Sequence, residues 1–125
     1  KMINSPHKNV IVIDDVNPIE QDHMKVRIVN GRLDEIRRDL EDPTARAIGM
    51  YKLCLEDAKR YYANIDKLIF DGKDKLKIEI PMTMLLPNFD IYAESTENHA
   101  WFEVDDARDL AHAHEIAHKF TENNI

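Results

Sequence analysis

The sequence has a single cysteine, few glycines and no long apolar run. Cys54 stands alone among 125 residues, so no disulfide can form within the chain. Three scattered glycines exclude a glycine-rich phosphate loop and the dinucleotide-binding fingerprint. No apolar stretch approaches 18 residues, and the first residues lack a signal-peptide core. We therefore expect a cytoplasmic protein that does not span a membrane.

The composition predicts an acidic globular protein. Apolar residues make up 43% of the chain and charged residues 33%, a balance typical of a folded domain. The formal net charge is -7, so the protein has no general attraction to duplex DNA or to anionic lipid. Any contact with a nucleotide has to come from a local basic cluster.

The first half of the sequence predicts a strand followed by two helices. Asn9–Asp14 is a short β-branched run that favours a strand. Asn17 and Pro18 then form a helix-start signal. The helix predicted from Pro18 to about Leu40 carries apolar residues at heptad-like spacing, which are Ile19, Val26, Val29, Leu33, Ile36 and Leu40. The alternative is a short strand, Lys25–Val29, that turns at Asn30-Gly31.

A second helix-start signal follows at Asp42 and Pro43. Its apolar stripe is Ile48, Tyr51, Leu55, Ala58, Tyr62 and Ile65. A short connection joins the two predicted helices, so we expect an antiparallel hairpin over about residues 18–66. Narrow stripes of this kind favour helix–helix packing, within the chain or with a second copy.

The second half predicts a strand meander and a last helix. Leu76, Ile78 and Ile80 alternate with polar residues, as in a half-buried strand. Further extended segments are expected at 82–86, 89–93 and 99–104, which gives a meander over about residues 74–104. A C-terminal helix is expected over about 105–121. The fold class is therefore α+β, with a small antiparallel sheet packed with a helical hairpin and a C-terminal helix, in a single domain over residues 1–125.

The stretch His114-Glu115-Ile116-Ala117-His118 matches a zinc-binding signature. Two histidines four residues apart on a helix can reach one metal, with the glutamate as general base. A catalytic zinc also needs a third protein ligand, and no histidine follows His118. We therefore favour a solvated or half-buried histidine pair without metal, and a minimal zinc hydrolase using His114, Glu115 and His118 is an alternative.

The start of the last helix is a candidate anion site. Free backbone N–H groups at a helix start can hold a phosphate, and Arg108 adds a fork-shaped donor. Asp105 in the same stretch can bind ribose hydroxyls. The alternative is that the aspartates cap the helix and pair with Arg108.

Two further groups are binding candidates. Phe89 and Trp101 offer faces on which a base can stack, and Asn88 can read its edge, although a small domain also needs aromatic residues for its core. His23 and Arg27 lie one turn apart on the predicted first helix. If that helix packs between copies of the chain, the His23 and Arg27 side chains of all copies surround the symmetry axis and can hold an anion there. The ordinary alternative is a charged helix flank.

No nucleophile stands beside a base in any recognisable motif, so we expect a binding protein rather than an enzyme, with no cofactor. The strand at Asn9–Asp14, the Pro18 helix start with His23 and Arg27, and the closing stretch 105–110 together resemble the phage anti-Thoeris proteins, the first-described family of signal sponges. The resemblance covers essentially the whole chain and rests on its overall character.

The resemblance implies a phage protein in the cytoplasm of the infected bacterial host. It implies binding and sequestration, without cleavage, of a cyclic ADP-ribose-type immune signal, with cyclic oligonucleotides at a separate site between subunits. It also implies a homodimer or homohexamer. Arg108 is then a phosphate contact in the main pocket and Arg27 a contact between subunits, and the stacking residue is Phe89, Phe70 or Trp101.

A second class of function is an inhibitor that binds a host defence protein such as a CRISPR effector. An acidic surface can imitate nucleic acid, so the charge of the chain is compatible with this alternative.

Overall fold

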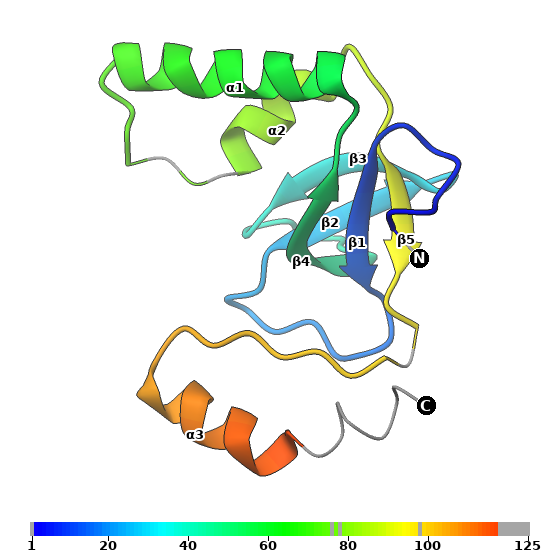
Figure 1. The fold of residues 1–125 in the computed structure, drawn as a ribbon, viewed down its shortest axis with the longest axis vertical. Helices are drawn as coiled ribbons and strands as arrows, with labels where there is room; N and C mark the ends of the chain where they lie inside the picture. Colours follow the sequence, from blue (N-terminus) through cyan, green and yellow to red (C-terminus); the bar gives the residue numbers. More distant parts are fainter. Residues whose placement is uncertain (1, 76, 78, 98, 118–125) are drawn as a thin grey trace. The chain divides into compact units, whose positions relative to one another are not determined.

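A computed structural model describes residues 2–75, 77, 79–97 and 99–117. The described chain combines helices and strands and divides into two compact units, Lys1–Ser95 and Thr96–Ile125. The element order is β1 Val10–Asp14, β2 Lys25–Val29, β3 Arg32–Arg37, β4 Ala45–Lys52, α1 Leu55–Phe70, α2 Glu79–Leu85, β5 Tyr92–Ser95 and α3 Ala107–Ile116 (Figure 1).

The five strands close into a barrel in the order β1-β4-β2-β3-β5. Neighbouring strands are antiparallel except β1 and β5, which run parallel and close the barrel. The expected combination of helices and strands is confirmed, whereas the expected small antiparallel sheet is a closed barrel with one parallel strand pair. Helices α1 and α2 lie together beside one end of the barrel (Figure 1).

The predicted helical hairpin over residues 18–66 is wrong in its first arm. Residues 25–37 form the β2–β3 hairpin, which turns at Asn30 and Gly31 with φ values of 51° and 75°. A left-handed pair of this kind matches the twist of a two-residue hairpin turn. The short-strand alternative at Lys25–Val29 is therefore confirmed. In the second arm, β4 replaces the expected first half of the helix, and α1 begins only at Leu55.

The expected meander over residues 74–104 is correct in one strand only. The strand expected at 89–93 overlaps β5. The segment expected to be extended at 82–86 lies largely in α2, because Pro81 sits in the first turn of a helix, where its missing N–H is tolerated. Leu76 and Ile78 lie outside the described residues. The described part of 99–104 contains no strand.

The buried core lies inside the barrel and under the two helices. Its largest fully buried apolar side chains come from four strands or their flanks and from α2, and are Ile11, Ile36, Met82, Ile91, Val10 and Val26. Asn9 joins this core to α1, because its amide oxygen accepts the Cys54 N–H and its nitrogen donates to Asp57 at 2.8 Å. The helix start is thus capped from β1, since Cys54 itself makes no side-chain cap.

Candidate functional site

A buried carboxylate, Glu79, is the least satisfied polar group of the described core. Glu79 opens α2, and only 6% of its surface is exposed. Its Oε2 atom has no hydrogen-bond partner among the described residues. A buried carboxylate oxygen without a donor costs on the order of 1–3 kcal/mol or more. A hydrogen-bond donor for the Glu79 Oε2 atom therefore has to come from outside the described protein atoms.

Two tyrosines lie near this carboxylate. Tyr51 comes from β4 and Tyr61 from α1, and both pack in the core cluster. Burial first, and then the phenol of Tyr61 and the charge of Glu79, raise the pKa of Tyr51 to about 12. The pKa of Tyr61 is raised as well, first by burial, then by Tyr62 and Glu79. Both phenols therefore stay protonated at neutral pH and keep their hydrogen-bonding hydroxyl groups.

Two side-chain hydrogen bonds hold the backbone around Glu79. The Thr83 hydroxyl donates to the Glu79 carbonyl at 2.9 Å, and the Asn64 amide of α1 donates to the Pro81 carbonyl at 3.4 Å. The first bond lies within α2 and the second joins α2 to α1, so the carboxylate is positioned by packed elements. A site built on packed elements keeps its geometry better than one on a loop.

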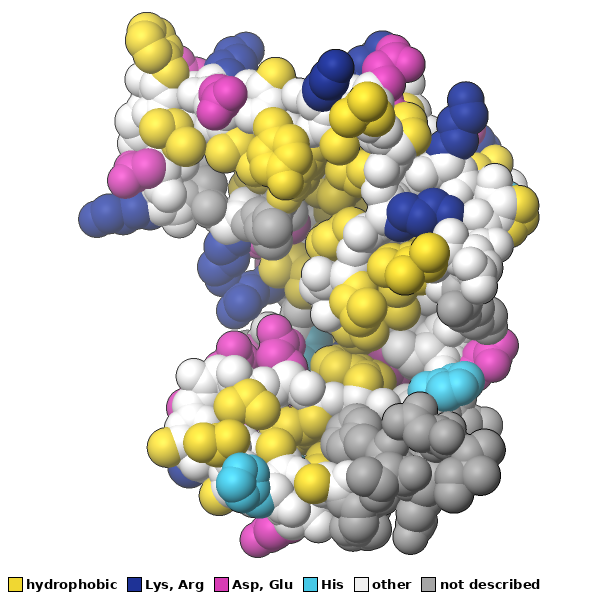
Figure 2. Space-filling view, in the orientation of Figure 1, with side chains coloured by type: hydrophobic (Ala, Val, Ile, Leu, Met, Phe, Trp, Pro, Cys, Tyr) yellow, Lys and Arg dark blue, Asp and Glu magenta, His cyan; other side chains and the backbone are white. Residues whose placement is uncertain are grey.

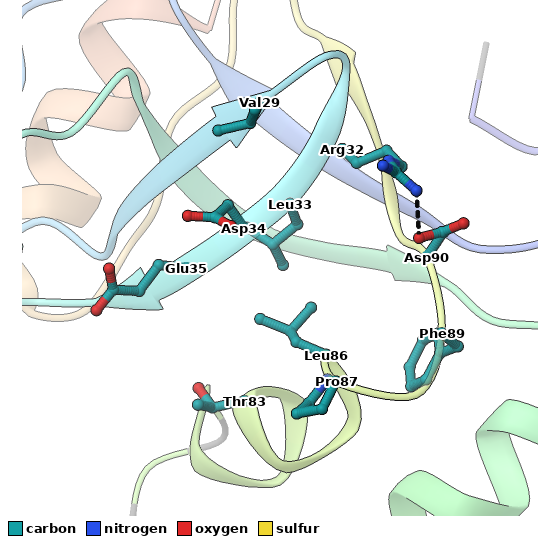
Figure 3. Close-up of a pocket in the computed structure, with 10 residues that line it drawn as sticks. All are labelled: Val29, Arg32, Leu33, Asp34, Glu35, Thr83, Leu86, Pro87, Phe89 and Asp90. Carbon is teal, nitrogen blue, oxygen red and sulfur yellow. Dashed lines mark hydrogen bonds and ion pairs between the residues drawn. The ribbon is translucent and has the colours of Figure 1, made fainter.

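A groove opens in the first unit between the β2–β3 hairpin and the end of α2 (Figure 3). Its volume is about 460 Å³, which is within the range of small-molecule sites. Leu33, Leu86 and Phe89 provide apolar walls. Arg32 donates to Asp90 at 2.7 Å at one end, and Asp34 and Glu35 lie along the strand, so the polar groups of the groove are mostly carboxylates.

A third cluster joins the end of β1 to the start of β4. The Asp14 carboxylate is fully buried and accepts hydrogen bonds from the Val16 and Asn17 N–H groups and from Arg46, the last at 2.7 Å. Burial alone would raise the pKa of Asp14, but the bonds from Asn17, Arg46 and Val16 outweigh it and hold that pKa well below its usual range. Arg46 also contacts the His23 ring at 2.9 Å.

The histidine of this cluster lies near two carboxylates. Ligand atoms of Glu20, Asp22 and His23 lie within 4.8 Å of one another, which is a spacing that a metal ion can bridge. The Arg46 guanidinium against the same ring adds a positive charge that opposes a cation, and the Glu20 N–H already occupies His23 Nδ1 at 2.9 Å. We interpret the cluster as structural.

The structure places His23 and Arg27 on different elements from those expected. His23 lies in the loop before β2, and Arg27 lies in β2, so the helix flank predicted for them is wrong. Arg27 donates to Glu35 at 2.8 Å and lies 3.7 Å from Asp34. Two carboxylates thus already partner this guanidinium, which reduces its attraction for an anion.

The start of α3 is a complete helix cap. Asp106 accepts the N–H groups of Arg108 and Asp109, and Asp109 accepts those of Asp105 and Asp106. Arg108 folds back on Asp106 at 2.9 Å, and its side chain is 93% exposed. The backbone donors and the guanidinium that we expected to hold phosphate are therefore engaged within the turn, as in the capping alternative.

The remaining predicted residues are dispersed. Phe89 lines the groove, and the exposed Asn88 precedes it. Phe70 ends α1 and is 90% exposed. Trp101 is half-buried in the second unit. Phe89 shares the groove with Asp34 and Glu35, the two carboxylates beside Arg27, but Arg27 itself does not line it.

The zinc signature is only partly described. His114 and Glu115 are exposed on α3, and the Glu115 carboxylate lies 3.5 Å from His112. His118 lies outside the described residues. The described part of α3 contains no buried residue, so nothing there shields a metal site from water.

No family model and no curated protein matches the chain. Its fold is similar to a solved structure, the CTP:phosphocholine cytidylyltransferase of Streptococcus pneumoniae, with a TM-score of 0.62 at 17% identity. The match covers 89% of this chain and 49% of that chain, so the chain spans about half the length of the enzyme. The likeness establishes the fold alone.

Sequence reasoning missed Glu79. The alternation of apolar and charged residues before it favoured a strand, which placed Glu79 on a solvated face. The signal that could have located it is Pro81, since proline two residues after an acidic residue is typical of a helix start.

Proposed function

We propose that the chain is part of a nucleotidyltransferase-type protein and binds the small polar acceptor substrate through Glu79. The observation that supports this proposal is the buried Glu79 Oε2 atom without a partner in the described core. The likeness in fold to a cytidylyltransferase adds a class of reaction in which a small acceptor has to be held.

The chemistry of the site favours a ligand that carries hydrogen-bond donors or a positive charge. A carboxylate accepts and cannot donate, so a hydroxyl or N–H donor of a ligand satisfies it by a hydrogen bond, whereas a quaternary ammonium group pairs with it by charge alone. Tyr51 and Tyr61 lie close enough to feel that charge, and aromatic rings also favour a cationic headgroup. Phosphocholine, named for the similar enzyme, carries such a headgroup, and sugar-type hydroxyls are the neutral equivalent.

The test is calorimetric titration of the chain with phosphocholine, choline and CTP, each alone and in pairs. We expect saturable binding of at least one acceptor, and a loss of at least about tenfold in affinity for Glu79→Gln with the circular dichroism spectrum unchanged. Glu56→Gln is the matched control, because Glu56 is exposed on α1. Equal binding by both variants would contradict the role of Glu79.

Sequestration of a cyclic ADP-ribose-type signal is the second proposal. The groove beside Phe89 favours it, since its volume suits a nucleotide and Phe89 offers a stacking face. The carboxylates of the groove count against a diphosphate ligand. The same titration includes a cyclic ADP-ribose isomer. Binding that survives Glu79→Gln, is lost with Phe89→Ala and releases the ligand intact would favour sequestration over the acceptor site.

A further inference from the structure

An apolar stripe on α1 is exposed to solvent. Leu55, Tyr62 and Ile69 follow one another at intervals of seven residues, so they share one side of the helix. They are 74%, 65% and 55% exposed, and Phe70 beside them is 90% exposed. Figure 2 shows hydrophobic side chains gathered over this helix with charged side chains between them. The buried residues Tyr61 and Leu68 occupy a different side of α1.

Exposed aromatic and aliphatic side chains in one row are typical of an interaction surface. Large apolar side chains at heptad spacing are typical of a helix that packs against a second helix. Covering the row removes its apolar surface from water, which stabilises the pair. The row extends over a 16-residue helix, a length of about 24 Å. Both ends of the row carry large side chains, so the surface continues over the whole helix.

The charged residues beside the row indicate that the helix that covers it is α1 of a second copy. Lys59 and Asp66 are exposed and lie along the same flank, three residues before and four residues after Tyr62. If two copies of α1 pack antiparallel about an axis between Tyr62 and Ala63, Lys59 of each copy faces Asp66 of the other. A parallel pair would place Lys59 against Lys59 and Asp66 against Asp66. The charge pattern is therefore complementary to itself in the antiparallel arrangement alone.

The apolar residues fit the same register. Leu55 of one copy lies opposite Phe70 of the other, and the two Tyr62 rings meet near the axis. Ala63 beside the axis has a small side chain, which allows close approach of the two helices. We propose that α1 is a homodimer interface in which two copies pack antiparallel through Leu55, Tyr62, Ile69 and Phe70, with Lys59–Asp66 ion pairs that set the register.

The area of the proposed interface is small, which limits the affinity of the dimer. One helix pair buries less than the roughly 800 Å² per partner of a standard interface. We therefore expect a reversible dimer that forms in the micromolar range or above, with ion pairs that direct orientation more than they add affinity. This inference does not depend on the proposed function, since Glu79 lies on α2.

The experiment is sedimentation velocity of the full chain from low to several hundred micromolar protein. We expect a concentration-dependent dimer, and a weakening of at least about tenfold in the single variants Lys59→Glu and Asp66→Lys, because each places like charges opposite one another. The double variant K59E/D66K exchanges both charges and should return the dimer to within about threefold of the original affinity. Tyr62→Glu should abolish it.

Lys67→Glu is the matched control, since Lys67 is an exposed lysine of α1 away from the stripe. Circular dichroism of each variant confirms that the helix is retained. A chain that stays monomeric throughout the concentration range would overturn the proposal. A dimer that Lys59→Glu weakens but that K59E/D66K does not restore would overturn it equally, because the register would then be wrong.

Discussion

At the scale of single residues, two buried carboxylates differ in how well they are satisfied. Asp14 accepts bonds from two backbone N–H groups, from the Asn17 amide and from Arg46. Glu79 leaves one oxygen without a donor in the described core. Buried polar groups are nearly always paired, so the first arrangement is expected of a structural residue and the second of a binding residue.

Replacing Asp14 by asparagine should destabilise the fold by about 3 kcal/mol, because it removes the buried negative charge that pairs with Arg46 at 2.7 Å. The folded-state pKa of Asp14 lies well below its ordinary value. The stabilisation is therefore fully present above that ordinary value, near pH 4, and is lost as the pH falls. Urea unfolding at several pH values measures both effects.

The control for Asp14 is Asp15→Asn, an exposed neighbour, which should change the free energy of unfolding by less than about 1 kcal/mol. The difference between the original chain and Asp14→Asn should shrink as the pH falls below about 4, because the Asp14 carboxylate of the unfolded chain then binds a proton while that of the folded chain stays charged. A difference that stays constant down to pH 2 would contradict the role assigned to the Asp14 charge.

Replacing Glu79 by leucine should raise the free energy of unfolding by about 1–2 kcal/mol, because an unpaired buried oxygen is removed and apolar surface is added. Thermal and urea unfolding of the ligand-free protein measure the change. Glu103→Leu, at an exposed position, is the control and should show no gain. A clear loss of stability in Glu79→Leu would mean that the carboxylate has a structural partner and would count against the acceptor site.

At the scale of elements, the sequence predicted the strand β1 and the start of α3 and missed the hairpin β2–β3. Strand β1 is a β-branched run, and Asp106 is a strong capping residue, so local chemistry decides both. In the hairpin, Val26 and Leu33 are both buried, but they lie on two strands joined by a turn. Their spacing of seven residues imitates a helix, and a periodicity count cannot distinguish the two.

The second predicted helix is wrong in its first half, for a related reason, while its second half is α1. Ala45, Ala47 and Met50 suit a helix by propensity, yet β4 pairs with β1 and β2, and Gly49 within it has a φ of 76° that no helix accepts. Tertiary pairing thus overrides local preference. Glu79 was missed because its burial depends on α1 and β3, which pack against α2 only in the folded chain.

The turn at Gly31 gives a prediction for the hairpin. Gly31→Ala should cost about 1 kcal/mol, because a side chain disfavours the φ of 75°. A Cβ at this position meets no atom within 4 Å, so crowding adds nothing. Val29→Ala beside the turn is the control for a general loss of hairpin contacts. Urea unfolding checks the value, and a loss above about 3 kcal/mol would mean that more than the turn is affected.

At the scale of the whole molecule, the hydrophobic core belongs to one unit. Every buried apolar residue of the described chain lies between Val10 and Ile91, inside the first unit. The described residues include no helix that is long and apolar enough to cross a membrane. The likeness to the cytidylyltransferase covers most of this chain and about half of the enzyme. This likeness lies in the three-dimensional arrangement of the helices and strands, and local patterns in the sequence do not reveal that arrangement.

A chain ended after Ser95 should therefore fold. It retains all five strands, α1, α2 and the buried core, while α3 contributes no buried residue. We expect cooperative urea unfolding with a midpoint close to that of the full chain, and a smaller m-value, since less surface is exposed on unfolding. A chain ended after Phe70, which lacks α2 and β5, is the control and should not unfold cooperatively. If the 1–95 chain also lost its cooperative transition, the stability of the barrel would have to depend on residues beyond Ser95.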